Sequence, residues 1–261
     1  TGIIPEMSKL KKLTLLQMNS CQISNTIPSE IGYLTALEEL NLSSNSISGE
    51  IPPEFGNLKK LKRLFLHSNR LTGSIPPSLG GLPILEQLYL SNNYLSGSIP
   101  TALGLLSSLQ LLILNNNNLS GTIPTSLGSL DKLTYLYLHY NKLSGAIPSQ
   151  LGSLSSLYYL QLNNNALRGA IPPELGNLSR LRNFYAQMNQ LQGNIPAEIS
   201  NLTYLQQLNL SFNQLSGTIP ADLGKLTNLL ILDLSTNQFT GLIPNEIGQL
   251  KNLTQLLLDR N

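Results

Sequence analysis

Residues 37–58 read LEELNLSSNSISGEIPPEFGNL, and this stretch decides the fold because it returns along almost the whole chain. The Ile-Pro dipeptide marks each return, and after a first interval of 23 residues every spacing is 24. Its prolines are Pro5, Pro28, Pro52, Pro76, Pro100, Pro124, Pro148, Pro172, Pro196, Pro220 and Pro244. A fixed period of this length indicates a stack of identical structural units.

Each unit contains a short segment in which apolar and polar residues alternate. Around Leu40-Asn41-Leu42 the leucines occupy one face of an extended chain, while Glu39 and Asn41 occupy the other. One such strand cannot bury its leucines alone, so the units must stack, with parallel strands about 4.7–4.9 Å apart. We count eleven strand segments, the last ending at Asn261.

The remaining repeated residues predict how the chain turns. An asparagine such as Asn45 follows each strand, and its amide is expected to satisfy buried backbone groups in a ladder through the stack. Cys21 takes this position in the first unit, where we expect a small buried group. A glycine such as Gly49 permits a bend, and the proline after it suits the start of a short helical turn.

These residues closely resemble the plant-type leucine-rich repeats of receptor-kinase ectodomains, receptor-like proteins and polygalacturonase inhibitors. The element that carries the resemblance is Leu-x-Gly-x-Ile-Pro, as in residues 95–100, and it covers essentially the whole chain. The resemblance implies an α/β repeat solenoid, a right-handed superhelix with a parallel β-sheet on its concave face. Short 3₁₀ turns and a second short sheet lie outside. We expect residues 1–261 to form one such domain, cut in mid-repeat and uncapped at both ends, with end-to-end self-association as a consequence.

Composition excludes several partners. Only 11% of residues are charged, against roughly 25% in an average soluble domain, and the formal net charge is +2. That balance favours a neutral partner and gives no basic stripe for nucleic acid. No run approaches the roughly 20 apolar residues of a membrane span, so we expect no membrane contact by this segment.

Because repeats hold the scaffold constant, recognition is expected at the outward strand positions that vary. Eight of the fifteen Phe and Tyr residues lie at such positions, where burial does not require them. Exposed aromatics gathered on one face commonly mark an interaction surface, although cross-strand pairing alone also favours them. The predicted concave-face site consists of Phe65, His67, Tyr89, Tyr135, Tyr137, His139, Tyr140, Tyr159, Tyr185, Met188 and Phe212.

No catalytic site or cofactor is predicted. His67 and His139 stand three repeats apart, roughly 14–15 Å by strand spacing, which is too far to share a metal with ligand bonds of about 2 Å. No Ser, His and acid set converges. Glu39 and Arg63 occupy the same position on adjacent strands, so a lateral salt bridge is expected there.

Six Asn-x-Ser/Thr sequons, which predict glycosylation, stand at Asn41, Asn118, Asn177, Asn201, Asn209 and Asn252. The leading hypothesis is an extracellular or cell-surface recognition domain whose concave face binds a protein, peptide or glycan. The alternatives are a secreted inhibitor of a cell-wall hydrolase and a structural or engineered scaffold without a natural ligand. An ice-contacting solenoid would need a flat, regular ladder of Thr or Asn, and the outward strand positions are too irregular for one.

Overall fold

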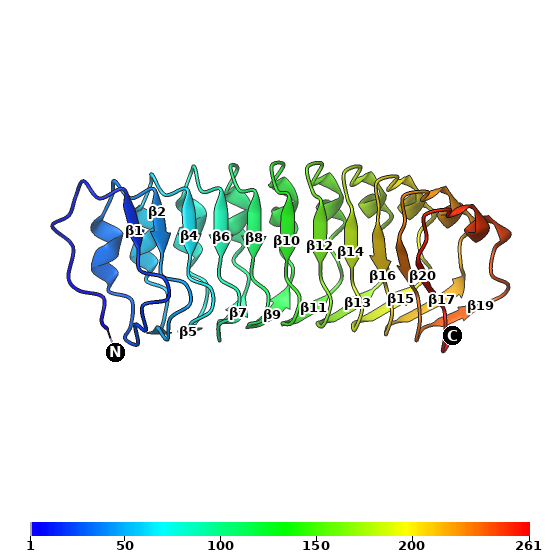
Figure 1. The fold of residues 1–261 in the computed structure, drawn as a ribbon, viewed down its shortest axis with the longest axis horizontal. Helices are drawn as coiled ribbons and strands as arrows, with labels where there is room; N and C mark the ends of the chain where they lie inside the picture. Colours follow the sequence, from blue (N-terminus) through cyan, green and yellow to red (C-terminus); the bar gives the residue numbers. More distant parts are fainter. Residues whose placement is uncertain (1) are drawn as a thin grey trace.

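The computed structural model describes residues 2–261 as one curved stack of repeats (Figure 1). The larger sheet has eleven parallel strands in chain order. They are β1 (Leu15–Gln17), β2 (Glu39–Asn41), β4 (Arg63–Phe65), β6 (Gln87–Tyr89), β8 (Leu111–Ile113), β10 (Tyr135–Tyr137), β12 (Tyr159–Gln161), β14 (Asn183–Tyr185), β16 (Gln207–Asn209), β18 (Ile231–Asp233) and β20 (Gln255–Leu257). We call the outward face of this sheet the concave face.

A second, shorter set of strands runs along the lower edge of the stack in Figure 1. Seven form one parallel sheet: β7 (Ser96–Ser98), β9 (Asn118–Thr122), β11 (Lys142–Gly145), β13 (Ala166–Gly169), β15 (Gln190–Gly193), β17 (Gln214–Thr218) and β19 (Gln238–Thr240). Another two, β3 (Ser48–Gly49) and β5 (Arg70–Leu71), pair with each other.

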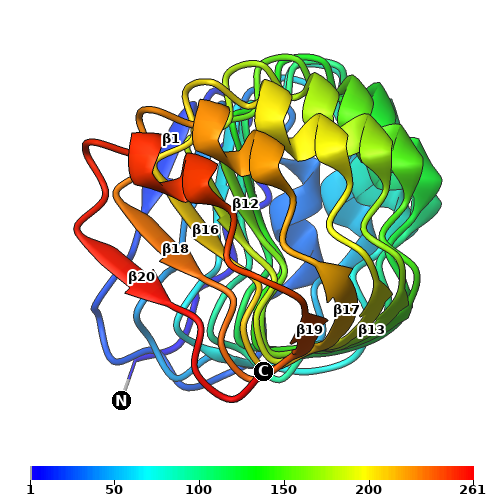
Figure 2. The same ribbon diagram turned by 90° about the vertical axis from the view of Figure 1, so that its right-hand side faces the viewer.

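Ten 3₁₀ turns cover the side opposite the concave face, as the view along the stack shows (Figure 2). They are η1 (Ser29–Tyr33), η2 (Pro53–Asn57), η3 (Pro77–Gly81), η4 (Thr101–Leu105), η5 (Thr125–Ser129), η6 (Ser149–Ser153), η7 (Pro173–Asn177), η8 (Ala197–Asn201), η9 (Ala221–Lys225) and η10 (Asn245–Gln249). Each directly follows the repeated Ile-Pro. The predicted solenoid with two sheets and outer 3₁₀ turns is confirmed.

The core is a single column of leucine, isoleucine and phenylalanine between these layers. Leu40, Leu42, Ile47 and Phe55 are fully buried, and their equivalents are buried in nearly every repeat. In the last repeat, by contrast, Ile243, the equivalent of the buried Ile51, is 58% exposed, because no further unit covers it among the residues described.

The asparagine ladder forms as predicted. In the repeat of Asn69, the side-chain amide donates to the carbonyl oxygens of Leu42 and Leu66 at 2.9 and 3.1 Å. Its Oδ1 accepts from the Ile47 amide at 3.0 Å. The same pattern recurs from Asn45 to Asn237, so each amide ties its own repeat to the preceding one.

The prediction of a buried Cys21 is wrong, because this side chain is exposed. Its Sγ donates a hydrogen bond to the carbonyl oxygen of Asn19 at 3.3 Å. Burial of a ladder residue requires a preceding repeat whose carbonyl groups it can reach, and the first unit has none among residues 2–20. The spacing correctly predicts that Cys21 takes the ladder position of the repeat, but it does not predict that the side chain is exposed.

Glycine at the fourth position of the 3₁₀ turns lets successive turns pack closely. A methyl group on Gly152 would overlap the carbonyl oxygen of Glu174 in the next repeat and lie 2.6 Å from its carbonyl carbon. Gly248 stands at the equivalent position of η10, where an added methyl group would meet nothing within 4 Å.

We therefore predict that Gly152→Ala destabilises the protein by about 1–3 kcal/mol, the usual cost of overpacking a tight interior. Gly248→Ala should be neutral or slightly stabilising, because alanine is the better residue in a helical turn. Urea unfolding followed by circular dichroism measures both. Equal midpoints for the two variants would show that close packing of the turns does not limit stability.

Candidate functional site

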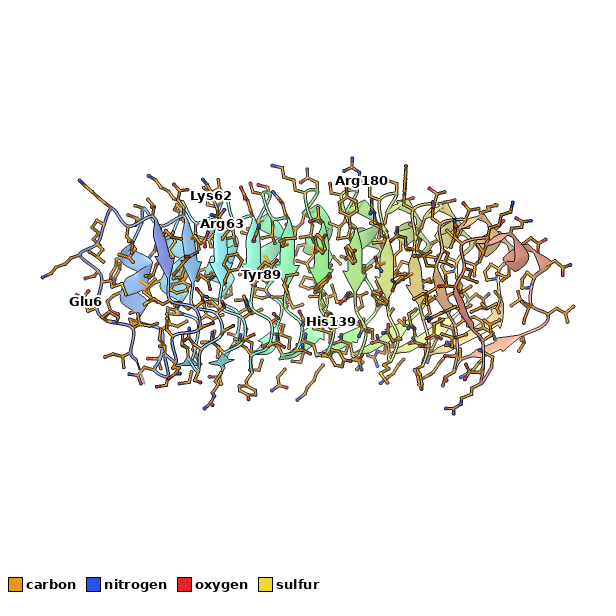
Figure 3. The ribbon with its side chains drawn as sticks, in the orientation of Figure 1. Glu6, Lys62, Arg63, Tyr89, His139 and Arg180 are labelled. Atoms are coloured by element: carbon orange, nitrogen blue, oxygen red, sulfur yellow. The ribbon has the colours of Figure 1, made fainter. Side chains whose placement is uncertain are left out.

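The concave face gathers the predicted aromatic residues into two clusters. In the first, the ring of Phe65 meets that of Tyr89 edge to face at 5.1 Å, and His67 lies 5.7 Å from Tyr89 between ring centroids. Figure 3 labels Tyr89 and His139, which belong to different clusters on this face. We call the set of Phe65, His67 and Tyr89 the first aromatic cluster.

The second, larger group is the central aromatic cluster: Tyr135, Tyr137, His139, Tyr140 and Tyr159. Tyr135 and Tyr159 are partners in strand register and stack at 4.9 Å with only 8° between their ring planes. Tyr137 meets both of them edge to face, at 5.9 and 6.4 Å. Offset stacks and edge-to-face contacts are the geometries that aromatic rings favour.

Strand β8 separates the clusters with an aliphatic residue. Ile113 pairs in register with Tyr89 on one side and with Tyr137 on the other. Although it points outward, only 7% of it is exposed. The tyrosines of the neighbouring strands shield it, so the two clusters and Ile113 form one continuous apolar surface.

Two predicted residues lie apart from these clusters. The Tyr185 hydroxyl bonds to Gln207 Oε1 and accepts from Asn183 Nδ2 at 3.2 Å. Asn164 Nδ2 donates to the Met188 sulfur at 2.9 Å. Tyr185 is thus part of a polar network on β14 and β16 and does not extend the aromatic stack.

The histidines of the two clusters are uncharged at neutral pH. Burial lowers the pKa of His139 to about 4 and also lowers the pKa of His67. Burial, reinforced by the neighbouring tyrosines, raises the pKa of Tyr137 to about 12. The centre of the concave face is therefore neutral over the whole physiological range.

Three buried side-chain atoms have no hydrogen-bond partner among residues 2–261: Nδ1 of His67, Nδ1 of His139 and Oε1 of Gln187. All three residues occupy the same repeat position, two residues after the end of a strand. Buried polar atoms without partners are uncommon in folded proteins. All three atoms lie beneath the surface of the concave face, at one position of the repeat.

A rim of residues with left-handed backbone borders the clusters. One residue per repeat, directly before the ladder asparagine, has φ near +55°, and three repeats use Asn92, Asn116 and Asn164 there. Asparagine is several-fold enriched in this conformation. Tyr140, Met188 and Phe212 adopt it as well, and they are 53%, 48% and 45% exposed. Large exposed side chains at a position that suits asparagine are not explained by folding.

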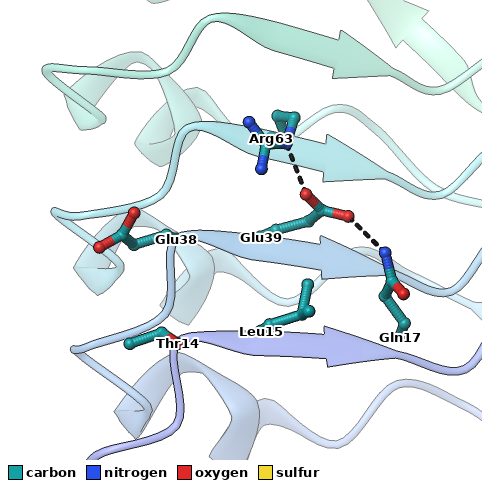
Figure 4. A pocket seen from close by; sticks show the side chains of 6 residues that line it. All are labelled: Thr14, Leu15, Gln17, Glu38, Glu39 and Arg63. Atoms are coloured by element: carbon teal, nitrogen blue, oxygen red, sulfur yellow. Dashed lines mark hydrogen bonds and ion pairs between the residues drawn. The ribbon is translucent and has the colours of Figure 1, made fainter.

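The predicted salt bridge between Glu39 and Arg63 is confirmed (Figure 4). Gln17 Nε2 also donates to Glu39, at 2.8 Å. Burial alone would raise the pKa of Glu39, but the hydrogen bonds from Gln17 and Arg63 outweigh it and lower the pKa. This carboxylate is already bonded within the sheet, and Glu38, which lines the same pocket, is paired with Lys62.

The sequons divide into two kinds. At Asn41 and Asn209 the side-chain oxygen accepts from the hydroxyl of the serine two residues later, at 2.7 Å in each case, and these serines are buried. The other four asparagines, which are exposed, are Asn118, Asn177, Asn201 and Asn252. Glycosylation remains a prediction, and the exposed asparagines are its better candidates.

Residues outside the predicted set also line a pocket, at the edge where β12 and β14 begin: Tyr158, Arg180, Arg182 and Tyr204. The visible signal was Arg180-Leu181-Arg182, two arginines around a framework leucine. None of these four residues is among the predicted site residues, which lie on or after the strands.

Residues 2–261 contain neither a metal-binding cluster nor a helix that could span a membrane. No three His, Cys, Asp or Glu residues within 2–261 come together in a way that could hold a metal ion. None of its helices combines the length and the apolar character that crossing a bilayer requires.

Family models of one kind match most of the chain. A family model described as a leucine-rich repeat region matches residues 79–194. Models described as leucine-rich repeat match residues 35–95 and 203–261, and residues 12–34. A search of curated proteins gave no match.

Three solved structures are similar to the chain. The plant peptide hormone receptor RGFR1, solved in complex with RGF2, is 39% identical over 99% of this chain and 42% of its own, with a TM-score of 0.97. The Arabidopsis receptor kinase HAESA, solved with the peptide hormone IDA and the co-receptor SERK1, is 36% identical over 95% and 42%, with a TM-score of 0.89. A plant ice-binding protein is 32% identical over 94% and 79%, with a TM-score of 0.77. The chain thus spans less than half the length of the two receptors.

The lowered histidine pKa values predict a pH effect on stability. The unfolded chain protonates His139 near pH 6.5, whereas the folded chain does so only near pH 4. The free energy of unfolding should therefore fall as pH drops below about 6.5 and stop falling on this account below about 4. His139→Phe, which keeps an aromatic ring in place, should flatten that slope.

Urea midpoints between pH 7 and pH 4 measure the effect as the difference between wild type and variant. Carboxylate titration is common to both proteins and cancels in this difference. Identical pH slopes would show that His139 is not desolvated.

Proposed function

The chain belongs to the leucine-rich repeat family, and we propose that its concave face recognises an extended peptide in the manner of a plant receptor ectodomain. The observation that carries the proposal is the continuous apolar surface of two aromatic clusters joined by Ile113. Such a surface is not needed to bury the core, because the leucines do that from the opposite face. Tyrosines provide contact area together with hydroxyl groups at a small entropic cost.

The dimensions suit a peptide. Seven consecutive strands, β4 to β16, carry the predicted residues from Phe65 to Phe212. Six strand spacings amount to about 29 Å, which an extended chain of about nine residues would cover. The face is neutral in charge at its centre, so apolar and hydrogen-bonding side chains are expected in the ligand.

Among protein, peptide and glycan ligands, the similar solved structures support a peptide. RGFR1 and HAESA were both solved with peptide hormones. By this likeness, the place of action is outside the cell or at its surface, and the role is recognition without catalysis. The alternative is that the same surface binds and inhibits a cell-wall hydrolase. An inhibition assay against such enzymes would identify this function.

The rim offers a test that leaves the scaffold undisturbed. We predict that Tyr140→Asn combined with Phe212→Asn weakens binding of a selected peptide at least tenfold. The reason is that two exposed contact residues are removed, while asparagine is the residue that neighbouring repeats already use at this backbone conformation. The peptide would be selected from a random twelve-residue library on the wild-type protein, and its Kd measured by calorimetry.

Tyr94→Asn is the matched control for this experiment. Tyr94 is 58% exposed beside the second sheet, and the next repeat carries Asn118 at its position. The Kd of the selected peptide for the Tyr94→Asn variant should equal its Kd for the wild-type protein. Failure to select any peptide, or equal Kd values for the rim variant and the wild type, would contradict the proposal.

A second candidate function, contact with ice, is favoured by a different surface. Small hydroxyl residues pair across the strands of the second sheet: Ser98 with Ser120, Thr122 with Ser144, and Thr218 with Thr240. These pairs do not continue as one ladder, since Ser120 also pairs with Lys142 and Ser144 with Ala166. The chain covers 79% of the similar plant ice-binding protein.

If this surface contacts ice, the wild-type protein should slow ice recrystallisation, and Thr122→Lys should abolish the effect by placing a long charged side chain among the hydroxyl residues. Tyr137→Ala, on the other face, should leave it intact. Grain growth in frozen sucrose solution, compared with albumin at equal mass, measures this. Growth as fast as with albumin would eliminate the second candidate.

A further inference from the structure

The outward residues of the concave face change in chemistry along the stack. One column runs in strand register from β4 to β18, and we call it the central column. Its members are Phe65, Tyr89, Ile113, Tyr137, Gln161, Tyr185, Asn209 and Asp233. The first four are aromatic or aliphatic, the next three are polar and uncharged, and the last is a carboxylate. A ligand lying across the strands meets these three kinds of surface in that order.

The polar stretch consists mainly of carboxamides. Gln161 and Asn209 stand in the central column, and Asn183 and Gln207 stand beside them on β14 and β16. The Tyr185 hydroxyl accepts from the Asn183 amide and bonds to Gln207. Because carboxamides both donate and accept hydrogen bonds, this stretch fits polar, uncharged ligand groups.

Asp233 takes part in a local motif that needs an oxygen but no charge. Its Oδ1 accepts from the backbone amide of Ser235 at 3.1 Å and from the Ser235 hydroxyl at 2.7 Å. Asn41 and Asn209 make the same two bonds to the serine two residues later, again with a hydroxyl distance of 2.7 Å. Asparagine therefore fulfils the structural role in two other repeats, and the negative charge of Asp233 is not explained by folding.

That charge is not neutralised within residues 2–261. None of the ion pairs in this range includes Asp233. Its partners in register on the flanking strands, Asn209 and Leu257, are uncharged, and Arg260, which follows β20, lies 3.9 Å from Asp259. Figure 2 shows β16, β18 and β20 side by side. Since a carboxylate has about four acceptor sites, the other oxygen of Asp233 can accept from a ligand.

The two ends of the concave face thus differ in charge. Glu39, the other carboxylate at an outward strand position, is neutralised by Arg63. The β2 end therefore offers no net charge, whereas the β18 end offers one negative charge. Four strand spacings separate Tyr137 on β10 from Asp233 on β18, which is about 19 Å, or about six residues of extended chain.

We propose that Asp233 binds a cationic group of the ligand, an ammonium or a guanidinium. This contact fixes the direction of the ligand on the concave face, with its apolar part on β4 to β10 and its positive charge at β18. Charge-assisted hydrogen bonds are the strong ones among polar contacts, and charge complementarity sets register and specificity. The proposal rests on the peptide recognition proposed above and adds to it the charge and the spacing of the ligand groups.

Parallel peptide selections test this proposal. A random twelve-residue library is selected on the wild-type protein, on Asp233→Asn and on Glu246→Gln. The first variant keeps the oxygen that Ser235 requires, and the second removes an equal charge from the exposed end of η10, away from the concave face.

Peptides from the wild type and from Glu246→Gln should carry Lys or Arg about six residues from an aromatic or aliphatic residue. Peptides from Asp233→Asn should show no enrichment of basic residues, because the only unpaired carboxylate at an outward strand position has been removed. Equal enrichment on all three proteins would overturn the proposal.

A double-mutant cycle then assigns the contact. The basic residue of a wild-type-selected peptide is replaced by Gln, and the Kd of both peptides is measured by calorimetry for the wild type and for Asp233→Asn. Each single change should weaken binding at least fivefold, and the two together should cost little more than one, because the same ion pair is lost. Glu246→Gln should leave both Kd values unchanged. Additive losses would place the peptide cation elsewhere and refute the proposal.

This proposal and the peptide site can fail separately. Peptide binding that depends on Tyr140 and Phe212 but not on Asp233 would support the peptide site and overturn the role of Asp233. Binding that depends on Asp233 but not on those two residues would support the cation contact and contradict the rim contact. If no peptide can be selected on the wild-type protein, both proposals are wrong.

Discussion

The buried amide of the ladder asparagine is the interaction on which the rest of the structure depends. Packing of leucine against leucine stabilises the stack but has no direction, so it does not by itself set how one repeat aligns with the next. The amide does so, because Asn69 bonds simultaneously to Leu42, Leu66 and Ile47 in two repeats. Losing such a partner would leave buried backbone groups unsatisfied, at about 1–3 kcal/mol each. Equivalent residues are thereby held in straight columns along the concave face.

The same constraint explains how much of the fold the sequence could predict. The leucines, the ladder asparagines and the Ile-Pro element are local and periodic, so their positions follow from spacing alone. Cys21 shows the limit of that reasoning, because burial at the ladder position also depends on a preceding repeat. The left-handed residue before each asparagine was not predicted either, since Ser44, Asn92, Tyr140 and Thr236 share no residue type that would reveal it.

The site was less predictable than the scaffold, because contacts on an open face depend on side-chain direction as well as on spacing. Spacing placed Tyr135, Tyr137 and Tyr159 near one another, and they do meet. It could not indicate that Tyr185 bonds to Gln207 and leaves the stack. Nor could it identify Arg180 and Arg182 as pocket residues, because they precede the strand, where the alternation of inward and outward positions has not yet begun.

The concave sheet places apolar contact area and charge in different regions of its surface. Burial keeps His67 and His139 uncharged, and the only carboxylate in the first strands, Glu39, is taken up by Arg63 and Gln17. The middle of the face can therefore provide contact area, but little discrimination between ligands by charge. Positive charge lies at the edge of the sheet, where Arg180 and Arg182 line a hollow. Since electrostatic complementarity contributes more to specificity and register than to affinity, the neutral middle of the face is suited to contact area and the charged edge to discrimination between ligands.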